Sequence, residues 1–200
     1  MLIGVPKEIK TREFRVGLVP SSVAELVRRG HQVLVETDAG QGIGADDAEY
    51  KAAGAEIASS AGDVFARAEM IVKVKEPQPN EWVQLSSKQI LFTYLHLAAD
   101  APQAFGLAES GCTAIAYETI TDDAGGLPLL APMSEVAGRL AVIEGASHLK
   151  ANAGGRGILI SGVPGTAPAD IVVIGGGVVG VNAAKMAVGL VARVTVFDRS

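Results

Sequence analysis

Glycines near the end of the chain are spaced for binding a nucleotide phosphate. The run IVVIGGGVVG at 171–180 joins a buried-strand pattern to G-x-G-x-x-G, and a helix-like segment follows at 181–190. Gly175 permits a tight turn, Gly177 lets the backbone approach a pyrophosphate, and Gly180 lets the helix pack close to the strand. Amides at the helix start would face the phosphates. The residues expected to bind a cofactor here are Gly175, Gly177, Val178, Val179 and Gly180.

An acidic residue follows where a carboxylate can bind ribose. The strand pattern at 193–197 ends in Asp198, roughly 20 residues beyond the glycines, the spacing of dinucleotide-binding proteins. A carboxylate at this place accepts hydrogen bonds from the ribose 2′-hydroxyl and repels a 2′-phosphate. The combined pattern predicts that NAD binds here rather than NADP. A purely structural glycine turn and an ordinary exposed acid are the alternatives.

Three further polar side chains lie in the first part of the chain, far apart in sequence. Lys75 and His96 come directly after apolar strand patterns, and ligands of open α/β sheets bind at the carboxyl ends of strands. Arg15 lies between the first strand and the first helix. Composition alone explains all three without function: Arg15 on a solvated loop, Lys75 capping a strand, and His96 as a hydrogen-bonded core histidine.

The elements that must position these residues follow a βα rhythm, which is typical of a mostly parallel sheet covered on both faces. The expected strands are 2–5, 31–36, 55–57, 70–74, 89–94, 113–117, 170–174 and 193–197. The expected helices are 20–29, 46–54, 61–68, 102–110, 133–150 and 181–190. Linker-like residues at 121–128 separate a first layered α/β domain, to which the resemblance described below assigns the substrate, at 1–130, from a nucleotide-binding domain at 131–200, which includes the connecting helix.

Composition excludes several other classes of protein. The 200 residues are 48% hydrophobic and 20% charged, as in a globular chain, and the longest apolar run, 171–181, is broken by glycines before it could span a membrane. The start lacks a secretory pattern, so we expect a cytoplasmic protein. A net charge of -5 argues against nucleic acid as a partner. A single cysteine, Cys112, rules out a disulfide framework and a cysteine zinc site, and we expect no metal and a buried thiol.

Six separated blocks, in the expected order, resemble bacterial alanine dehydrogenase. They are Gly4–Glu8, Glu13–Val16, Val72–Pro77, Thr93–Ala98, Ala116–Thr119 and Ala131–Ser134. The resemblance runs along the whole chain and includes the glycine motif. The transhydrogenase nucleotide-binding subunit is similar in its N-terminal segment and its glycine motif, but it lacks the pocket lysine and histidine. Because Lys75 and His96 are both present, the resemblance favours the dehydrogenase.

This resemblance implies NAD-dependent oxidative deamination of L-alanine to pyruvate and ammonium, and the reverse reductive amination. Arg15 would bind the substrate carboxylate, for which a guanidinium offers two parallel donors. Lys75 would pair with that carboxylate and polarise the keto or imino group. His96 would transfer the proton, since imidazole titrates near neutral pH.

The resemblance also assigns roles to residues around this pocket. Tyr94 and Met133 would line it, and Ser134 would contact the nicotinamide side of the cofactor. Glu118 is expected to be a nearby structural acid, with orientation of pocket residues as a second possibility. Members of the family form hexamers, so the resemblance implies a homo-oligomer.

The expected fold is two Rossmann-like layered α/β domains with mostly parallel sheets, the second of them incomplete. A Rossmann sheet has two βαβαβ halves, whereas this chain ends after the second strand of its nucleotide-binding domain. Two alternatives to an alanine dehydrogenase stay open. One is a transhydrogenase-like nucleotide-binding subunit, and the other is a truncated, catalytically inactive nucleotide-binding module.

Overall fold

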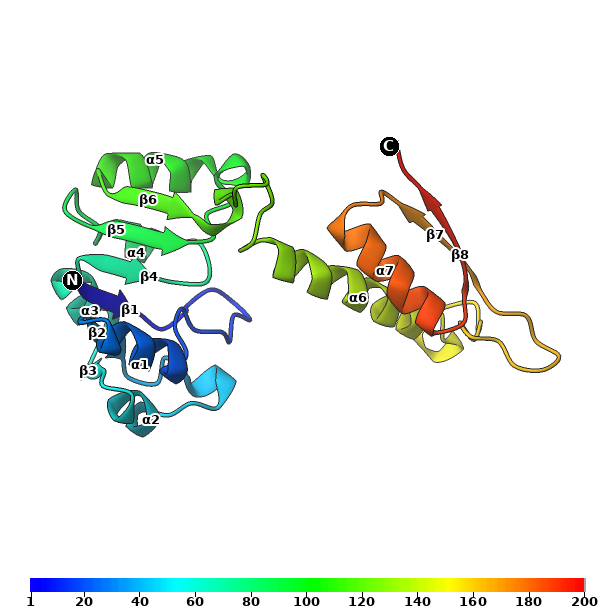
Figure 1. Cartoon of the computed structure of the whole chain (residues 1–200), viewed down its shortest axis with the longest axis horizontal. Coiled ribbons are helices and arrows are strands. Elements are labelled where there is room, and N and C mark those ends of the chain that lie inside the picture. Colours follow the sequence, from blue (N-terminus) through cyan, green and yellow to red (C-terminus); the bar gives the residue numbers. More distant parts are fainter. Residues whose placement is uncertain (200) are drawn as a thin grey trace. The chain divides into compact units, whose positions relative to one another are not determined.

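The computed structural model describes residues 1–199, which form two compact units (Figure 1). The first unit is Met1–Thr119 and the second begins at Ile120. Each unit has its own sheet. Two buried apolar clusters lie in the first unit and one lies in the second. The domain boundary near residue 130 stays a prediction.

A six-stranded parallel sheet forms the centre of the first unit. Its strands are β1 (Leu2–Val5), β2 (Gln32–Glu36), β3 (Glu56–Ala58), β4 (Met70–Val72), β5 (Ile90–Thr93) and β6 (Thr113–Ala116). They lie in the order β3-β2-β1-β4-β5-β6, and every pair is parallel. Strand order reverses between β1 and β4, and ligands of doubly wound sheets bind beyond the carboxyl ends of the strands at such a point. The predicted α/β fold is confirmed.

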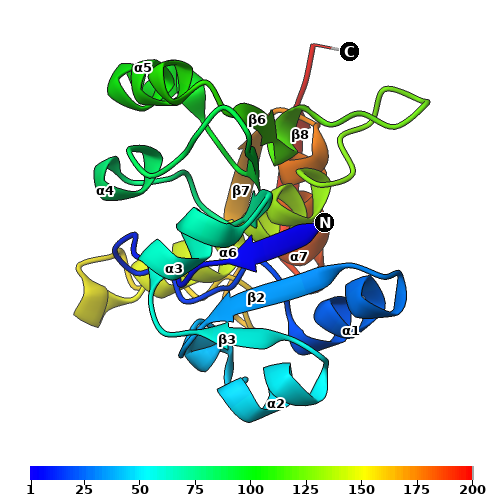
Figure 2. The same ribbon diagram turned by 90° about the vertical axis from the view of Figure 1, so that its left-hand side faces the viewer.

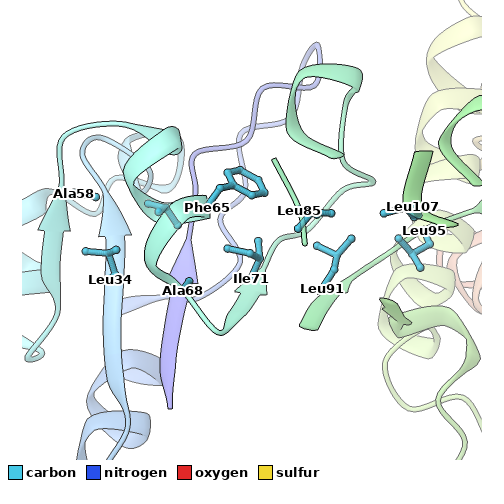
Figure 3. Packing of buried hydrophobic residues seen from close by; sticks show 10 residues of the cluster. Leu34, Ala58, Phe65, Ala68, Ile71, Leu85, Leu91, Leu95 and Leu107 are labelled. Atoms are coloured by element: carbon cyan, nitrogen blue, oxygen red, sulfur yellow. The ribbon is translucent and has the colours of Figure 1, made fainter. Parts of the chain in front are cut away.

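Helices cover both faces of this sheet (Figure 2). They are α1 (Pro20–Arg28), α2 (Asp47–Ala52), α3 (Ala61–Arg67), α4 (Pro79–Trp82) and α5 (Ala101–Ser110). Along β2, Val33 and Val35 point to the cluster under α1 and α2, whereas Leu34 points to the opposite cluster under α3 and α5. Figure 3 shows this second cluster, with Leu34, Phe65, Ile71 and Leu91 packed together. Burial on both faces explains why the central strands β1, β2 and β4 read as continuous apolar runs.

Sequence signals at the helix ends agree with the structure. Asp46 caps α2 by accepting a hydrogen bond from the Glu49 N–H at 2.9 Å, and Glu49 accepts one from the Asp46 N–H at 3.0 Å. Ser60 caps α3 in the same way through Asp63, at 3.3 Å. The four-residue α4 was not predicted, because a single turn is too short to show helical periodicity.

The second unit contains two helices and a parallel pair of strands. They are α6 (Ala131–His148), β7 (Asp170–Ile174), α7 (Val178–Gly189) and β8 (Arg193–Phe197). Val142, Ala183 and Ala187 lie in the buried cluster where α6 packs against α7. The helix predicted at 181–190 begins three residues earlier, because Gly177 occupies the N-cap position and Val178 already belongs to the first turn.

One expected residue is less buried than predicted. Cys112 is partly buried and packs at the edge of the cluster shown in Figure 3. Within residues 1–199, every helix is too short or too polar to cross a bilayer.

Candidate functional site

The segments after β4 and β5 carry two of the predicted site residues of the first unit, Lys75 and His96. Both strands are parallel neighbours, so the segments that follow them lie at one edge of the sheet. The pairing continues beyond the strands, since the Tyr94 N–H donates to the Val74 carbonyl at 3.2 Å. This pairing brings the segment of Lys75 beside that of Tyr94 and His96.

Lys75 is held through its backbone on two sides. Its carbonyl accepts a hydrogen bond from Thr93 Oγ1 at 2.9 Å, and its N–H donates to Glu8 Oε1 at 3.3 Å. Its Nζ lies 3.6 Å from Glu76 Oε2, with a quarter of the side chain exposed. Burial and the positive charges of Lys10 and Arg15 lower the pKa of Lys75. The amine therefore loses its proton more easily than an exposed lysine does.

His96 directly follows this edge and adopts a left-handed backbone conformation, with φ 50° and ψ 37°. The Glu118 carboxylate supports this conformation. Glu118 Oε1 accepts hydrogen bonds from the His96 N–H at 2.6 Å and from the Leu95 N–H at 3.1 Å. It also lies 3.9 Å from His96 Nδ1. Left-handed backbone is costly for a residue with a side chain, so these hydrogen bonds stabilise the turn that presents the imidazole.

Glu118 remains a carboxylate in this setting. Burial by itself raises the pKa of Glu118, but hydrogen bonds from the His96 and Leu95 amides outweigh it, and the pKa is lowered. The Glu118 carboxylate thus holds the backbone of His96 directly, and its role in orienting pocket residues stays a prediction.

An aromatic ring stacks against the imidazole of His96, and a second one packs behind it. The Tyr94 ring is parallel to the imidazole, with ring centroids 5.9 Å apart and 5° between their planes. Tyr117 packs edge-on against Tyr94 at 4.9 Å and against Phe92 at 4.4 Å. Burial raises the pKa of Tyr117 and of Tyr94. These tyrosines therefore stay protonated and form the apolar wall of the site.

Arg15 is paired with a residue of its own loop, between β1 and α1. Its Nε and Nη2 donate to the two carboxylate oxygens of Glu13 at 2.8 and 2.6 Å. This side-chain pairing is the main reason why the pKa of Glu13 is lowered to about 2. The charge of Arg15 also acts on the pKa of Lys75 and of Tyr94, so the three groups share one electrostatic environment. A carboxylate ligand would share the guanidinium with Glu13 or replace it.

A hollow of about 360 Å³ lies beside this loop. Among its lining residues are Lys7, Glu8, Lys10, Glu13 and Arg15. Lys75 and His96 are not among the residues that line it. Four of the lining side chains are cationic, Lys7, Lys10, Arg12 and Arg15, and three are acidic, Glu8, Glu13 and Asp38, so cations only slightly outnumber acids here.

The glycine turn of the second unit has a shape suited to a dinucleotide. Gly175 has a φ of 103°, which only glycine adopts without strain. A Cβ at Gly180 would overlap the carbonyl oxygen of Gly175, so this glycine allows the close approach of α7 to β7. A Cβ at Gly177 would meet nothing within 4 Å, leaving open space at the start of the helix. The residues present fit a pyrophosphate at this turn.

Asp198 lies beside the turn, at the end of β8, and its carboxylate accepts a hydrogen bond from the Gly176 N–H. Met133 and Ser134 lie in the first turn of α6, in the second unit. Their contacts with substrate and cofactor stay predictions. Among residues 1–199, no three His, Cys, Asp or Glu side chains are grouped to hold a metal ion.

Sequence reasoning missed three buried charged residues next to the site: Glu8, Lys73 and Glu81. Lys73 interrupts an apolar strand pattern, and a lysine there signals a buried partner. Its partners could not be identified from sequence, because Glu8 lies 65 residues away.

Comparison with protein families gives two matches that together cover nearly the whole chain. Residues 4–137 match the family described as alanine dehydrogenase/PNT, N-terminal domain, and residues 141–200 match alanine dehydrogenase/PNT, C-terminal domain. The chain is 59% identical to an alanine dehydrogenase of Halomonas elongata, over all of this chain and 54% of that protein. It is 55% identical to an alanine dehydrogenase of Bacillus subtilis, over 99% of this chain and 52% of that protein.

Solved structures give the same relationship. An L-alanine dehydrogenase matches with a TM-score of 0.93 and 56% identity, over 100% of this chain and 55% of that one. A transhydrogenase from Sinorhizobium meliloti matches with a TM-score of 0.83 and 28% identity, over 100% of this chain and 59% of that one. The chain thus spans about half the length of the relatives that it matches.

Proposed function

Because the chain belongs to the alanine dehydrogenase/PNT family, we propose that it contributes the substrate site and part of the cofactor site of an NAD-dependent alanine dehydrogenase. The reaction is oxidative deamination of L-alanine to pyruvate and ammonium, and its reverse. One observation carries the proposal. The Lys75 and His96 segments meet where β4 and β5 end, and Glu118 and Tyr94 hold the histidine in a fixed orientation.

We assign binding of the substrate carboxylate to two cationic side chains of the first unit, Arg15 and Lys75. Arg15 would bind the substrate carboxylate with its planar guanidinium, taking the place that Glu13 now holds. Lys75 would add a second positive charge to the carboxylate and polarise the keto or imino group. The lowered pKa of Lys75 makes proton exchange with that group easier than for an exposed lysine.

His96 is assigned the proton transfer, since an imidazole acts as an acid in one direction and a base in the other. Its side chain is about half exposed, so a substrate can reach the ring. Tyr94 and Met133 would line the pocket and limit it to small side chains. Glu118 would hold the histidine in place, through the hydrogen bond to its amide.

The cofactor is assigned to the second unit. Gly175, Gly177, Gly180 and the amides of Val178 and Val179 would hold the pyrophosphate, and Asp198 would bind the ribose. Ser134 would contact the nicotinamide side. NAD, when bound, accepts the hydride from alanine or returns it as NADH. The negative charge of Asp198 would select NAD over NADP.

Assembly and location follow the family as further proposals. We infer a cytoplasmic homo-oligomer, a hexamer by family resemblance, with small-molecule substrates and no nucleic-acid or membrane partner. A transhydrogenase-like subunit is not favoured, since that structure shares only 28% identity and the dehydrogenase shares 56%.

The test is NADH oxidation by the whole encoded polypeptide, followed with pyruvate and ammonium together and with each alone. We expect turnover only with both, and slower turnover with NADPH. Lys75→Ala and His96→Ala should each lose at least about 100-fold in rate, the usual range for a lost acid–base group. NADH binding without turnover would contradict the proposal and support an inactive nucleotide-binding module. Near-normal rates in either variant would remove that residue's assigned role.

A further inference from the structure

Three charged side chains are buried together beside the end of β4. The Lys73 side chain is fully buried, and its Nζ lies 3.1 Å from Glu8 Oε2 and 2.7 Å from Glu81 Oε1. Both glutamate side chains are at most 3% exposed. Burying charges is costly, and one ammonium cannot neutralise two carboxylates. Such a cluster needs a reason beyond packing.

Glu8 does more than neutralise Lys73. Its second oxygen, Oε1, accepts a hydrogen bond from the Val74 N–H at 2.6 Å and a longer one from the Lys75 N–H at 3.3 Å. The carboxylate is thus divided, with one oxygen on the ammonium and the other on two consecutive amides. Hydrogen bonds to an ionised acceptor are about twice as strong as neutral ones.

These amides lie where β1 no longer pairs with β4. The register between the two strands ends at Gly4 and Ile71, and the chain of β1 then turns away into the loop that carries Glu8. Glu8 therefore replaces a strand as the acceptor for residues 74 and 75. On the other side, Thr93 Oγ1 donates to the Lys75 carbonyl at 2.9 Å.

We propose that Glu8 is a positioning residue for Lys75: its buried carboxylate, held by Lys73, fixes the backbone from which the Lys75 side chain reaches the site. The proposal deepens the proposed function and rests on it for the role of Lys75. Glu81 completes the support. It holds the Lys73 ammonium with one oxygen and accepts a hydrogen bond from the Gln78 N–H at 2.7 Å with the other.

The cluster offers a clean variant. Glu8→Leu removes the acceptor for both amides but leaves Lys73 paired with Glu81, so no ammonium is left alone in the interior. Glu8→Gln keeps an oxygen that can accept from the Val74 amide, although its NH2 group then faces the Lys73 ammonium, which cannot accept a hydrogen bond. The matched control is Gln89→Leu. Gln89 is a buried side chain before β5, at the opposite edge of the sheet, and its Nε2 donates to the Phe65 and Ala68 carbonyls at 2.6 and 2.9 Å.

The experiment compares these variants with the whole unmodified polypeptide. Hydrogen exchange of the amides at 74 and 75 is read by mass spectrometry, and kcat/KM for pyruvate is measured at a temperature where circular dichroism shows every variant folded. For Glu8→Leu we expect at least tenfold faster exchange at these amides and a 10- to 100-fold loss of kcat/KM, the range seen when a reacting group is misplaced. Glu8→Gln should recover part of both, because it keeps one of the two acceptor oxygens. Gln89→Leu should keep kcat/KM within about twofold of that of the unmodified polypeptide. We expect this even if its melting temperature falls as far as that of Glu8→Leu.

Each contrary result has a definite meaning. Equal losses of kcat/KM in Glu8→Leu and Gln89→Leu, or unchanged exchange at 74 and 75 in Glu8→Leu, would overturn the positioning role. If Glu8→Leu does not fold, Glu8→Asp replaces it, because it keeps the charge and withdraws the oxygens from the amides. If the unmodified protein has no alanine dehydrogenase activity, the proposed function fails, and the exchange measurement still decides whether Glu8 holds this backbone.

Discussion

At the scale of single residues, the site depends on carboxylates that hold the backbone next to the proposed reacting groups. Glu118 accepts from the amides of Leu95 and His96, and Glu8 accepts from those of Val74 and Lys75. In both cases a side chain from one loop fixes the main chain of another. The functional side chains are therefore held by neighbours that would not themselves touch the substrate.

Replacement of Glu118 tests this support at the histidine. Glu118→Leu leaves two amides without an acceptor beside a left-handed residue, so we expect a loss of roughly 1 to 3 kcal/mol in the free energy of unfolding. Glu118→Gln keeps an acceptor and should lose less. Urea denaturation of the three proteins measures the difference. A leucine variant as stable as the unmodified protein would show that water satisfies these amides.

The Glu13–Arg15 pair predicts a dependence of stability on pH. Pairing with Arg15 lowers the pKa of Glu13 from 4.5 to about 2. A carboxyl whose pKa falls on folding contributes stability above its ordinary pKa, and that stability is lost as the pH falls toward the lower value. We expect Glu13→Gln to be on the order of 1 kcal/mol less stable than the unmodified protein at pH 6, with the gap closing between pH 4.5 and pH 2. Thermal melts across this range measure it, and a constant gap would refute it.

Sequence reasoning located some of these residues and missed others for a physical reason. Lys75 and His96 follow strand patterns, and the carboxyl ends of parallel strands are the usual ligand edge, but only the family resemblance singled them out, and their roles stay predictions. Glu8 and Lys73 could not be paired, because their contact depends on strand order, which brings β1 beside β4. The pairing of Arg15 with Glu13 is local, but its two-pronged geometry depends on the loop conformation.

At the scale of elements, the strands were the most predictable part of the fold. Within residues 1–199, each of the eight strands lies within two residues of its predicted bounds, since short β-branched and apolar runs between turn residues leave a strong pattern. The bounds of helices were less certain. The start of α7 was missed by three residues, because the glycines that mark the turn also belong to the first turn of the helix.

The glycine turn supplies a prediction for one element. A Cβ at Gly180 would overlap the Gly175 carbonyl, so Gly180→Ala should push α7 away from β7 and cost about 1 to 3 kcal/mol in stability. It should also weaken NADH binding at least tenfold. Gly189→Ala is the matched control at the end of the same helix, where a Cβ meets nothing within 4 Å.

The control should bind NADH normally and change stability by less than about 1 kcal/mol. Fluorescence titration with NADH and urea denaturation measure both effects. Equal behaviour of the two alanine variants would mean that the close approach of α7 to β7 is not required for cofactor binding.

At the scale of the whole molecule, the first unit has the properties of an independent folding domain. Both of its apolar clusters consist of residues from Met1–Thr119, one on each face of the sheet. We therefore expect residues 1–119, expressed alone, to unfold in one cooperative transition, with a urea m-value of about 1 to 3 kcal/mol per molar. Circular dichroism and tryptophan fluorescence of Trp82 should give the same midpoint. Non-coincident midpoints would show that this unit needs the rest of the chain.

The division into two units also separates the proposed tasks. Residues assigned to the amino acid lie mostly in the first unit, and those assigned to the dinucleotide lie in the second. Directed evolution can exploit this division. A library confined to Tyr94 and its neighbours in the first unit explores new amino acids while Arg15 and the glycine turn stay untouched, and a library at Asp198 explores coenzyme preference. Because no residue is assigned to both sets, gains from the two libraries should combine with little interference.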